Sequence, residues 1–412
     1  MKVHTEEIMD HYKELEAFIE SHREEMLSMW ADFVNTPSQA RDRAAAWNMG
    51  DKLVAVFKDM GMEVTEYDAG PINSRTIEAI WNKDLPGAPI LFSGHYDTVN
   101  SSPVKGAKPG DPDEFDGTPH FRVDAEGKAY GLGALDMKGG IVIAIWVTKA
   151  LQSIGWNGRP IKFLWAGDED KGHEGGNTPE LLMEYAKGAL CCFNMETGRV
   201  NNDLCIGRKG GGQGDLEIKG VGAHAGNDFL SGRNAVLEMC YKAIELSKLT
   251  NVELGTTVSP NVIAGGSVPN GIPENCHLQV DVRYTNLEER DRIGKAMAEI
   301  CAKPVIEGTS CEFTYKEFMA PFATTPEGLR LADFVAGISE EYDLGKMGQI
   351  FLGGGSDASY ITIAGVPTVC STGVRGQFNH TSKEYAEVES LYNRAKLFCA
   401  VVLNIEKFAD GN

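Results

Sequence analysis

The 412-residue sequence contains no apolar run long enough to cross a bilayer. Its longest runs, such as residues 141–147, fall far short of the roughly 20 apolar residues that a membrane-spanning helix needs. Basic residues are also scarce, because 39 Lys and Arg stand against 59 Asp and Glu, which gives a formal net charge of −20. Nucleic acids and anionic membranes are bound through an excess of positive charge. We therefore expect neither a nucleic-acid partner nor a membrane partner.

Cysteine motifs are missing as well. The nine cysteines include no C-x-x-C pair and show no zinc-finger spacing. We expect free, buried thiols in a reducing compartment. Residues 1–7 lack the apolar core of a signal peptide, and together these observations lead us to expect a cytoplasmic protein.

Three common cofactor-binding or catalytic motifs are incomplete or absent. The Gly-rich run at 353–356 lacks the Lys of a phosphate-binding loop, and Gly131-x-Gly133 lacks the third glycine of a dinucleotide fingerprint. The serine nucleophile elbow Gly-x-Ser-x-Gly does not occur. The chemistry of this chain is therefore to be sought among its carboxylates and imidazoles.

The order of predicted elements indicates an α/β protein with an insertion. Apolar segments at 89–93, 161–166 and 189–195 have the length of strands and alternate with helical patterns. This predicts a mostly parallel sheet covered by helices on both faces. Between 213 and 318 the order changes to strand, helix, strand, strand, helix, strand, which is the ferredoxin-like βαββαβ arrangement.

The domain limits follow from this change of pattern. We predict that residues 207–318 are inserted into a larger, discontinuous α/β/α domain formed by residues 1–206 and 319–412. A stretch rich in Gly, Pro and Asp at 101–120 predicts a surface loop. Helical patterns are found, among other places, at 5–35, 42–60 and 387–408.

Polar side chains follow the first of these predicted strands. His95 comes just after residues 89–93, and Asp97 points to the same side of an extended chain. In open α/β sheets, ligand sites lie beyond the carboxyl ends of the strands. We interpret His95 as a metal ligand and Asp97 as the carboxylate that receives its other ring N–H. A turn histidine beside a turn aspartate is the alternative.

Further carboxylates occupy similar positions. Asp136 lies between Gly131-x-Gly133 and Gly139-Gly140, where it could bridge two cations or cap the following helix. The three acidic residues 168–170 follow the predicted strand 161–166, and they repel one another unless cations or protons intervene. We interpret Asp170 as a metal ligand and Glu169 as a general base, with a solvated acidic turn as the alternative.

Two more candidates lie later in the chain. Glu196 ends the apolar run 189–195 with a charge that needs a partner, and His380 lies in a loop with Glu384 four residues on. A loop histidine alone is commonly unremarkable. Together, however, these side chains provide the imidazoles and carboxylates that a pair of divalent metals requires.

These motifs, taken in order, resemble those of the co-catalytic zinc peptidase family. That family includes glutamate carboxypeptidase, aminoacylase, acetylornithine deacetylase and succinyl-diaminopimelate desuccinylase. The resemblance extends from about residue 25 to about residue 405 and is nearest to the glutamate carboxypeptidase-like members. The motifs that carry it are Gly94-His95-Tyr96-Asp97, Gly131 to Gly140, Gly167 to Gly172, Met195 to Gly198 and Asn379-His380-Thr381.

The resemblance implies two zinc ions per subunit, for which manganese or cobalt could substitute. The implied ligand sets are His95, Asp136 and Glu196 for one ion, and Asp136, Asp170 and His380 for the other. It also implies that Glu169 is the base, that Asp97 orients His95, and that the Asp136–Met137 peptide bond is cis. The family usually has Glu at the position of Asp170, so the second ion could be held differently or more weakly. His173, three residues on, could compensate for the shorter side chain.

The resemblance also gives the predicted insertion a role as a lid and dimerisation domain. His224 lies in a segment that resembles the loop whose histidine reaches the partner subunit's active site, which implies a homodimer. Asn270 and Arg283 resemble the pair that grips the substrate carboxylate, and a planar guanidinium suits that role. Gly354 and Gly355 belong to a run that resembles the family's Gly-rich substrate loop.

The implied reaction is hydrolysis of an amide bond next to a free carboxylate. In this hypothesis two cations, roughly 3.5–4 Å apart, lower the pKa of a water molecule, and Glu169 passes its proton to the leaving nitrogen. A carboxypeptidase or dipeptidase acting on a small peptide fits this scheme best. An N-acyl-amino-acid deacylase is the nearer alternative, and a non-catalytic binding relative is the more distant one.

Overall fold

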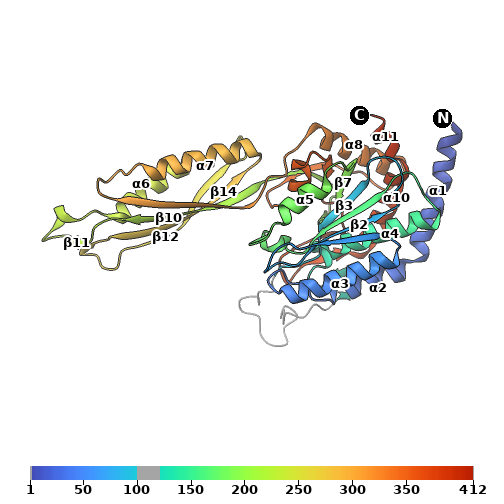
Figure 1. The fold of residues 1–412 in the computed structure, drawn as a ribbon, viewed down its shortest axis with the longest axis horizontal. Coiled ribbons are helices and arrows are strands. Elements are labelled where there is room, and N and C mark those ends of the chain that lie inside the picture. Colours follow the sequence, from blue (N-terminus) through green and yellow to red (C-terminus); the bar gives the residue numbers. More distant parts are fainter. Residues whose placement is uncertain (1, 100–120, 412) are drawn as a thin grey trace. The chain divides into compact units, whose positions relative to one another are not determined.

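The computed structural model describes residues 2–99 and 121–411, so the surface loop predicted at 101–120 lies outside the described residues. The chain forms two compact units of mixed α/β structure (Figure 1). The larger unit comprises Met1–Ile206, Thr324–Phe351 and Ser356–Asn412. The smaller unit comprises Gly207–Ala323 and Leu352–Gly355. The smaller unit thus runs past the predicted limit of 318 and takes in a second, short segment.

A six-stranded sheet of order β1-β2-β6-β3-β7-β17 forms the centre of the larger unit. The strands β6, β3, β7 and β17 are parallel, whereas β1 and β2 pair antiparallel at one edge. The sheet is therefore mixed rather than uniformly parallel. Its strands are β1 Glu63–Tyr67, β2 Thr76–Trp81, β3 Ile90–His95, β6 Ile161–Ala166, β7 Cys191–Asn194 and β17 Thr368–Val369.

Helices cover this sheet (Figure 1). All six residues of β3 are buried, as expected of a central strand with both faces covered. Twelve of the fifteen residues of α4 are buried as well, so this helix is apolar all round and lies within the core. The α-helices of the unit are α1 Lys2–Ser21, α2 Arg23–Val34, α3 Arg43–Asp59, α4 Gly139–Ser153, α5 Thr178–Ala186, α8 Pro326–Glu341, α9 Ala358–Ile363, α10 Val388–Leu403 and α11 Ile405–Ala409.

A second sheet of the larger unit positions a functional loop. Its order is β4-β5-β19-β18-β8, and the connection between β18 and β19 carries His380. The strands are β4 Arg122–Val123, β5 Lys128–Tyr130, β8 Gly198–Arg199, β18 Arg375–Gln377 and β19 Tyr385–Glu387. A further strand pair consists of β9 Leu204–Arg208 and β16 Gln349–Leu352.

The smaller unit contains an antiparallel sheet of order β12-β14-β10-β15 with α6 and α7 on one side (Figure 1). Along the chain the elements follow one another as βαββαβ. Burial alternates along β14, because one face of the sheet packs on the helices and the other does not. The elements are β10 Gly210–Lys219, α6 Ala235–Ser247, β12 Thr257–Gly265, β14 Asn275–Tyr284, α7 Leu287–Ala302 and β15 Ser310–Met319, with a short pair formed by β11 Ala223–His224 and β13 Gly271–Ile272.

Some predicted elements differ from the structure. The helix predicted at 5–35 is interrupted at His22, which allows each of its two apolar stripes to face the core. The helix predicted at 387–408 is likewise two helices that meet at Asn404. The smaller unit extends beyond residue 318 because Arg208 and Phe322 exchange backbone hydrogen bonds after β15 has ended.

All nine cysteines are free, as predicted. Cys240 is nevertheless exposed and Cys311 half-buried, so the expectation that every thiol is buried is wrong for these two. Among the residues that the structure describes, no helix combines the length and the apolar character that crossing a membrane requires.

Candidate metal centre

The topology of the larger unit brings several predicted residues to one edge of the sheet. The strand β3 lies between β6 and β7, and all three run in the same direction. His95 ends β3, residues 168–170 follow β6, and Glu196 follows β7. Because the carboxyl ends of parallel strands meet at one edge, these side chains converge there.

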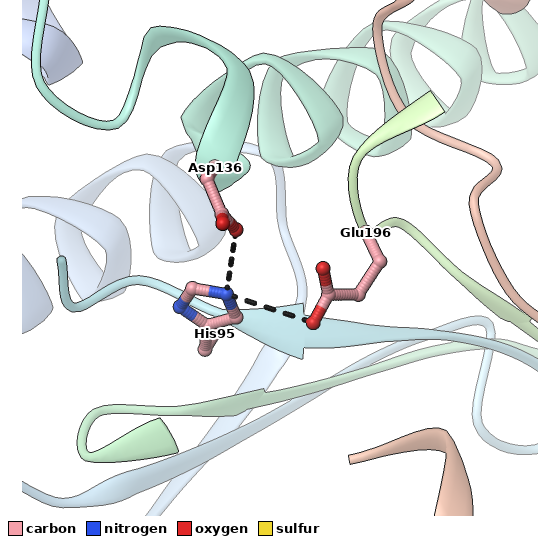
Figure 2. Close-up of side chains that lie close together, drawn as sticks. All are labelled: His95, Asp136 and Glu196. Carbon is pink, nitrogen blue, oxygen red and sulfur yellow. Dashed lines mark hydrogen bonds and ion pairs between the residues drawn. The ribbon is translucent and has the colours of Figure 1, made fainter. Parts of the chain in front are cut away.

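The first group consists of His95, Asp136 and Glu196, whose possible ligand atoms all lie within 4.8 Å of one another. The Nε2 atom of His95 is 3.2 Å from Oδ1 of Asp136 and 3.8 Å from Oε1 of Glu196. All three side chains are buried, and Figure 2 shows them pointing toward one another. This group could hold a metal ion.

The second group consists of Asp136, Asp170 and His380. The Nε2 atom of His380 is 3.0 Å from Oδ2 of Asp136 and 3.2 Å from Oδ1 of Asp170. Asp136 thus belongs to both groups, and each of its carboxylate oxygens faces a different imidazole. The His380 side chain is 53% exposed, whereas that of Asp136 is 6% exposed. The second group therefore opens toward solvent through His380.

Close packing brings Asp136 to this position. Gly140, in the first turn of α4, lies so near the end of β7 that a Cβ atom would come within 2.0 Å of the Met195 carbonyl oxygen. Only glycine therefore permits the chain before α4 to approach Glu196 this closely. The Asp136–Met137 peptide bond is cis, as the resemblance implied. The alternative in which Asp136 caps the helix is wrong, because α4 begins after Lys138 without a side-chain cap.

Two residues without a predicted role hold Asp136 in place. The backbone N–H groups of Leu135 and Asp136 donate to Oε1 of Glu384, at 2.8 and 3.1 Å. Asn379 donates from its side chain to Oδ2 of Asp136 at 3.0 Å. Burial raises the pKa of Glu384 to about 8, and the neighbouring charge of Asp136 acts in the same direction. Both residues flank His380 in the sequence, which is the one signal that could have indicated them.

Asp97 lies behind His95, away from the Asp136 side of the ring. Nδ1 of His95 is 3.4 Å from Oδ1 of Asp97 and 3.1 Å from its backbone oxygen. The Asp97 carboxylate also accepts the backbone N–H groups of Glu169 and Asp170, at 3.1 and 2.9 Å. Asp97 can form a further possible ligand group with His95 and Asp170. Its existing hydrogen bonds suit the predicted orienting role better.

The electrostatics of the site are dominated by buried carboxylates. Burial raises the pKa of Asp170 to about 7 and that of Glu169 well above its usual value. Burial acts against Asp136 as well, but hydrogen bonds from His380 and His95 outweigh it and lower the pKa of this carboxyl. Burial likewise opposes protonation of His95, and the surrounding carboxylates, Glu169 first, raise its pKa well above the usual value.

Asp170 provides a direct test of whether cations fit. Neither of its buried carboxylate oxygens has a hydrogen-bond partner of acceptable geometry in the part of the chain that the structure describes, although His380 lies within ion-pair distance. A buried carboxylate without donors is unfavourable unless a cation offsets its charge. Five carboxylates surround the two imidazoles, since Asp97 and Glu169 accompany the three acidic ligand candidates. The donor set therefore fits divalent metal ions.

His173 is not in any of these ligand groups among the described residues. Its ring instead lies between Asp168 and Asp357. The idea that it could compensate for the shorter side chain of Asp170 is therefore not supported.

The remaining predicted residues belong to the smaller unit. Nδ1 of His224 in β11 accepts the N–H groups of Gly226 and Asn227, at 3.1 and 3.0 Å. The backbone oxygen of Asn270 accepts the N–H of Ala225. Arg283, on β14, donates through Nε and Nη2 to the carboxylate of Asp281, each at 3.0 Å.

The Gly-rich run lies in the segment Leu352–Gly355 of the same unit. A Cβ atom at Gly354 would meet no atom of the described residues within 4 Å, and the Gly355 oxygen accepts a hydrogen bond from Arg208 at 3.0 Å. The roles assigned to His224, Asn270, Arg283 and these two glycines stay predictions.

Two relatives of established name are similar over most of the chain. The chain is 26% identical to carboxypeptidase G2 of Pseudomonas sp. (strain RS-16) over 378 residues, which covers 90% of this chain and 87% of the relative. It is 25% identical to succinyl-diaminopimelate desuccinylase of Rickettsia bellii (strain OSU 85-389) over 352 residues, with 79% and 84% covered.

Solved structures share the fold. The aminopeptidase PepT of Bacillus cereus ATCC 10987 superposes with a TM-score of 0.76 at 20% identity, and a tripeptidase of Staphylococcus aureus superposes with a TM-score of 0.75 at 21% identity. Each comparison covers 93% of this chain and 99% of the other. The family model "Peptidase family M20/M25/M40" matches residues 91–404, which is well over half of the sequence. The chain therefore belongs to peptidase family M20/M25/M40 and is a metallohydrolase of that family.

Proposed function

We propose that the protein is a di-zinc carboxypeptidase or dipeptidase, which hydrolyses the amide bond next to a free carboxylate and releases a C-terminal amino acid from a small peptide. The observation that carries this proposal is the position of Asp136, whose two carboxylate oxygens face different imidazoles. Glu169 lies beside the same site, with Oε2 3.9 Å from Nε2 of His95. Similarity to carboxypeptidase G2 supports cleavage at the C-terminal end of the substrate.

The two ligand groups would hold the metals. His95, Asp136 and Glu196 would bind one ion, and Asp136, Asp170 and His380 the other. Nε2 of His380 is 3.2 Å from Asp170 and 3.0 Å from Asp136, so the two carboxylates are almost equally near to it. This supports the role of Asp170 as a ligand despite its short side chain. Imidazole and carboxylate ligands together suit zinc, manganese or cobalt. When bound, such cations lower the pKa of the attacking water and polarise the scissile carbonyl.

The protein's own groups then move the proton and orient the ligands. Glu169 is largely desolvated, which raises its pKa and suits a group that takes a proton from water and passes it to the leaving nitrogen. Asp97 holds His95 through Nδ1 and holds the turn of Glu169 through two backbone N–H groups. Asp97 thereby positions both a metal ligand and the turn that carries the base.

The smaller unit would supply the substrate contacts. Arg283 and Asn270 would grip the free carboxylate, and Arg283 would exchange its bond to Asp281 for the substrate. His224 of the partner subunit would donate to the developing oxyanion, where such a donor contributes about 2.7–4 kcal/mol. Gly354 and Gly355 would allow the substrate backbone to approach closely.

A substrate panel tests the proposal. The protein is loaded separately with zinc, manganese and cobalt, and kcat/KM is measured for dipeptides that differ in their C-terminal residue. The same preparations are assayed with N-acetyl and N-succinyl amino acids. We expect dipeptides to be hydrolysed faster than the acyl amino acids. A chelated sample and the Glu169→Gln variant serve as controls, and metal content is determined for each.

A deacylase is the second candidate, because the desuccinylase of Rickettsia bellii is nearly as similar as carboxypeptidase G2. Preferential hydrolysis of N-acyl amino acids in the same panel would favour it. Stoichiometric metal without turnover of any substrate would instead favour a binding relative.

A further inference from the structure

A second cluster of buried polar side chains lies next to the proposed base. His173 is placed between two carboxylates, with Nδ1 2.9 Å from Oδ1 of Asp168 and Nε2 2.7 Å from Oδ1 of Asp357. Thr178 donates to the other oxygen of Asp168 at 3.0 Å. All four residues are at least 96% buried. None of them belongs to the ligand groups found among the described residues.

The geometry favours the protonated form of this histidine. Each ring nitrogen faces a carboxylate oxygen, and a neutral imidazole has only one N–H to donate. The ring can therefore donate to both carboxyl groups only as an imidazolium. Burial opposes this charge, but Asp357 and the hydrogen bonds to both carboxylates raise the pKa of His173 well above its usual value. His173 thus joins two buried carboxyl groups through its two ring nitrogens.

This hydrogen-bond network is attached to the turn that carries Glu169. The turn is closed by two backbone hydrogen bonds, from Gly172 to the Glu169 oxygen at 2.7 Å and from His173 to the Asp168 oxygen at 3.0 Å. On its other side, the Asp97 carboxylate accepts two of its N–H groups. The turn is therefore held by two anchors, which are the hydrogen bonds to Asp97 on the side of the metal-ligand groups and the hydrogen bond between Asp168 and His173 on the other.

The second anchor leads to a distant part of the chain. Asp357 immediately precedes α9 and follows the Gly-rich segment that belongs to the smaller unit. The other oxygen of Asp357 has no hydrogen-bond partner among the described residues. The contact with His173 is therefore the main hydrogen bond of this buried carboxyl group. His173 itself has a positive φ of 55°, a conformation that histidine and asparagine adopt more readily than most residues.

We propose that His173 is a positioning residue for the catalytic base: by joining Asp168 to Asp357, it fixes the turn from which Glu169 acts. The inference rests on the proposed function, because it assigns a partner to the base of that reaction. A side chain that served stability alone would change the melting temperature and leave kcat of the folded enzyme unaltered. A positioning residue changes kcat while KM and metal content stay the same.

Two substitutions, each of which keeps one of the two hydrogen bonds of His173, test the proposal. In His173→Asn the side-chain amide takes the place of Nδ1 and retains the bond to Asp168, and Asn tolerates the positive φ. In His173→Gln the amide takes the place of Nε2 and retains the bond to Asp357. His277→Asn is the matched control, since Nδ1 of His277 also lies 2.7 Å from a carboxylate, that of Glu217, but in the smaller unit and partly exposed.

We expect kcat to fall on the order of 10–100-fold in both His173 variants, as is typical when a partner behind an active-site group is lost. KM and bound metal should equal those of the wild type, and His277→Asn should resemble the wild type throughout. Asp357→Ala should cause a similar loss, because it also removes the hydrogen bond between residues 173 and 357. Combining it with His173→Asn should add little, since both changes remove the same interaction. Full kcat in His173→Asn, or losses that multiply in the double variant, would overturn the proposal.

Amide hydrogen exchange gives a readout that does not depend on catalysis. In metal-free protein, the amides of residues 169–172 should exchange faster in both His173 variants than in the wild type and the control. Unchanged exchange would contradict the anchor even if activity fell. Conversely, a wild type that hydrolyses no peptide would refute the proposed function, while faster exchange would still show that His173 holds the turn. Loss of metal together with kcat would assign His173 to the integrity of the whole site and also overturn the proposal.

Discussion

Replacing Glu384 with Ala tests how the backbone around Asp136 is held. Oε1 of this buried side chain accepts the N–H groups of Leu135 and Asp136, at 2.8 and 3.1 Å. A buried donor without a partner destabilises a protein by about 1–3 kcal/mol, so two such donors should lower the free energy of unfolding by roughly 2–6 kcal/mol. This is a large part of a typical total of about 5–15 kcal/mol. Since Asp136 belongs to both ligand groups, metal affinity should also fall, by about 10–100-fold.

The six tryptophans make this measurable, because all of them lie in the larger unit. Urea unfolding of metal-free protein followed by tryptophan fluorescence should show a lower midpoint, and zinc titration calorimetry should show weaker binding. Glu384→Gln should be milder, because its carbonyl oxygen can still accept both bonds. Wild-type values of both the midpoint and the zinc affinity in Glu384→Ala would refute the reasoning.

Glu238 offers a matched control. This buried carboxylate in the smaller unit accepts the N–H groups of Val305 and Ile306, with distances of 2.7–3.1 Å. Glu238→Ala removes the same type of interaction as Glu384→Ala and should leave zinc affinity unchanged. A loss of zinc binding in this variant as well would mean that affinity follows general stability rather than the position of Asp136.

Three further predictions concern the base, the subunits and acid stability. Glu169→Gln should reduce turnover by about 10²–10⁴-fold while metal content, measured by plasma mass spectrometry, is unchanged; retained turnover would remove Glu169 as the base. If His224 acts across a dimer, mixing His224→Ala with Glu169→Ala protein should restore activity in hybrid dimers, and no rescue despite verified subunit exchange would contradict this. Hydrogen bonds from Arg292 lower the pKa of Glu289 to about 2 from 4.5, so its contribution to stability is present above pH 4.5 and is lost as the pH falls toward 2. The difference in urea midpoint between wild type and Glu289→Gln should therefore shrink over that interval, and a constant difference would refute the assignment.

Much of the site could be predicted from the sequence because of one local pattern. His95 ends one apolar strand and residues 168–170 come shortly after another, and parallel strands bring their carboxyl ends to one edge. Glu196 follows the same rule. Asp136 and His380 lie outside it, since one comes from a turn before α4 and the other from a hairpin loop. Their placement was inferred through the resemblance rather than from periodicity.

The supporting contacts could not be predicted in this way. His173 and Asp357 are separated by 184 positions, and Glu384 lies 248 positions from the Asp136 N–H that it accepts. No periodic pattern links residues so far apart, because their contact depends on how whole elements pack. The pairing of Arg283 with Asp281 is different, since residues two apart on a strand share a face and could have been paired from the sequence alone.

The uneven exposure of the two ligand groups affects how ions would exchange. His380 is largely accessible, whereas His95, Asp136 and Glu196 are enclosed. A chelator arriving from solvent would first remove the outer ion, which is the one held by Asp136, Asp170 and His380. The inner ion, held by His95, Asp136 and Glu196, would leave only after the outer ion had dissociated from Asp136. Demetallation should then proceed in two kinetic phases. A preparation stripped briefly would hold a single, inner ion per chain, a species that spectroscopy with cobalt could isolate.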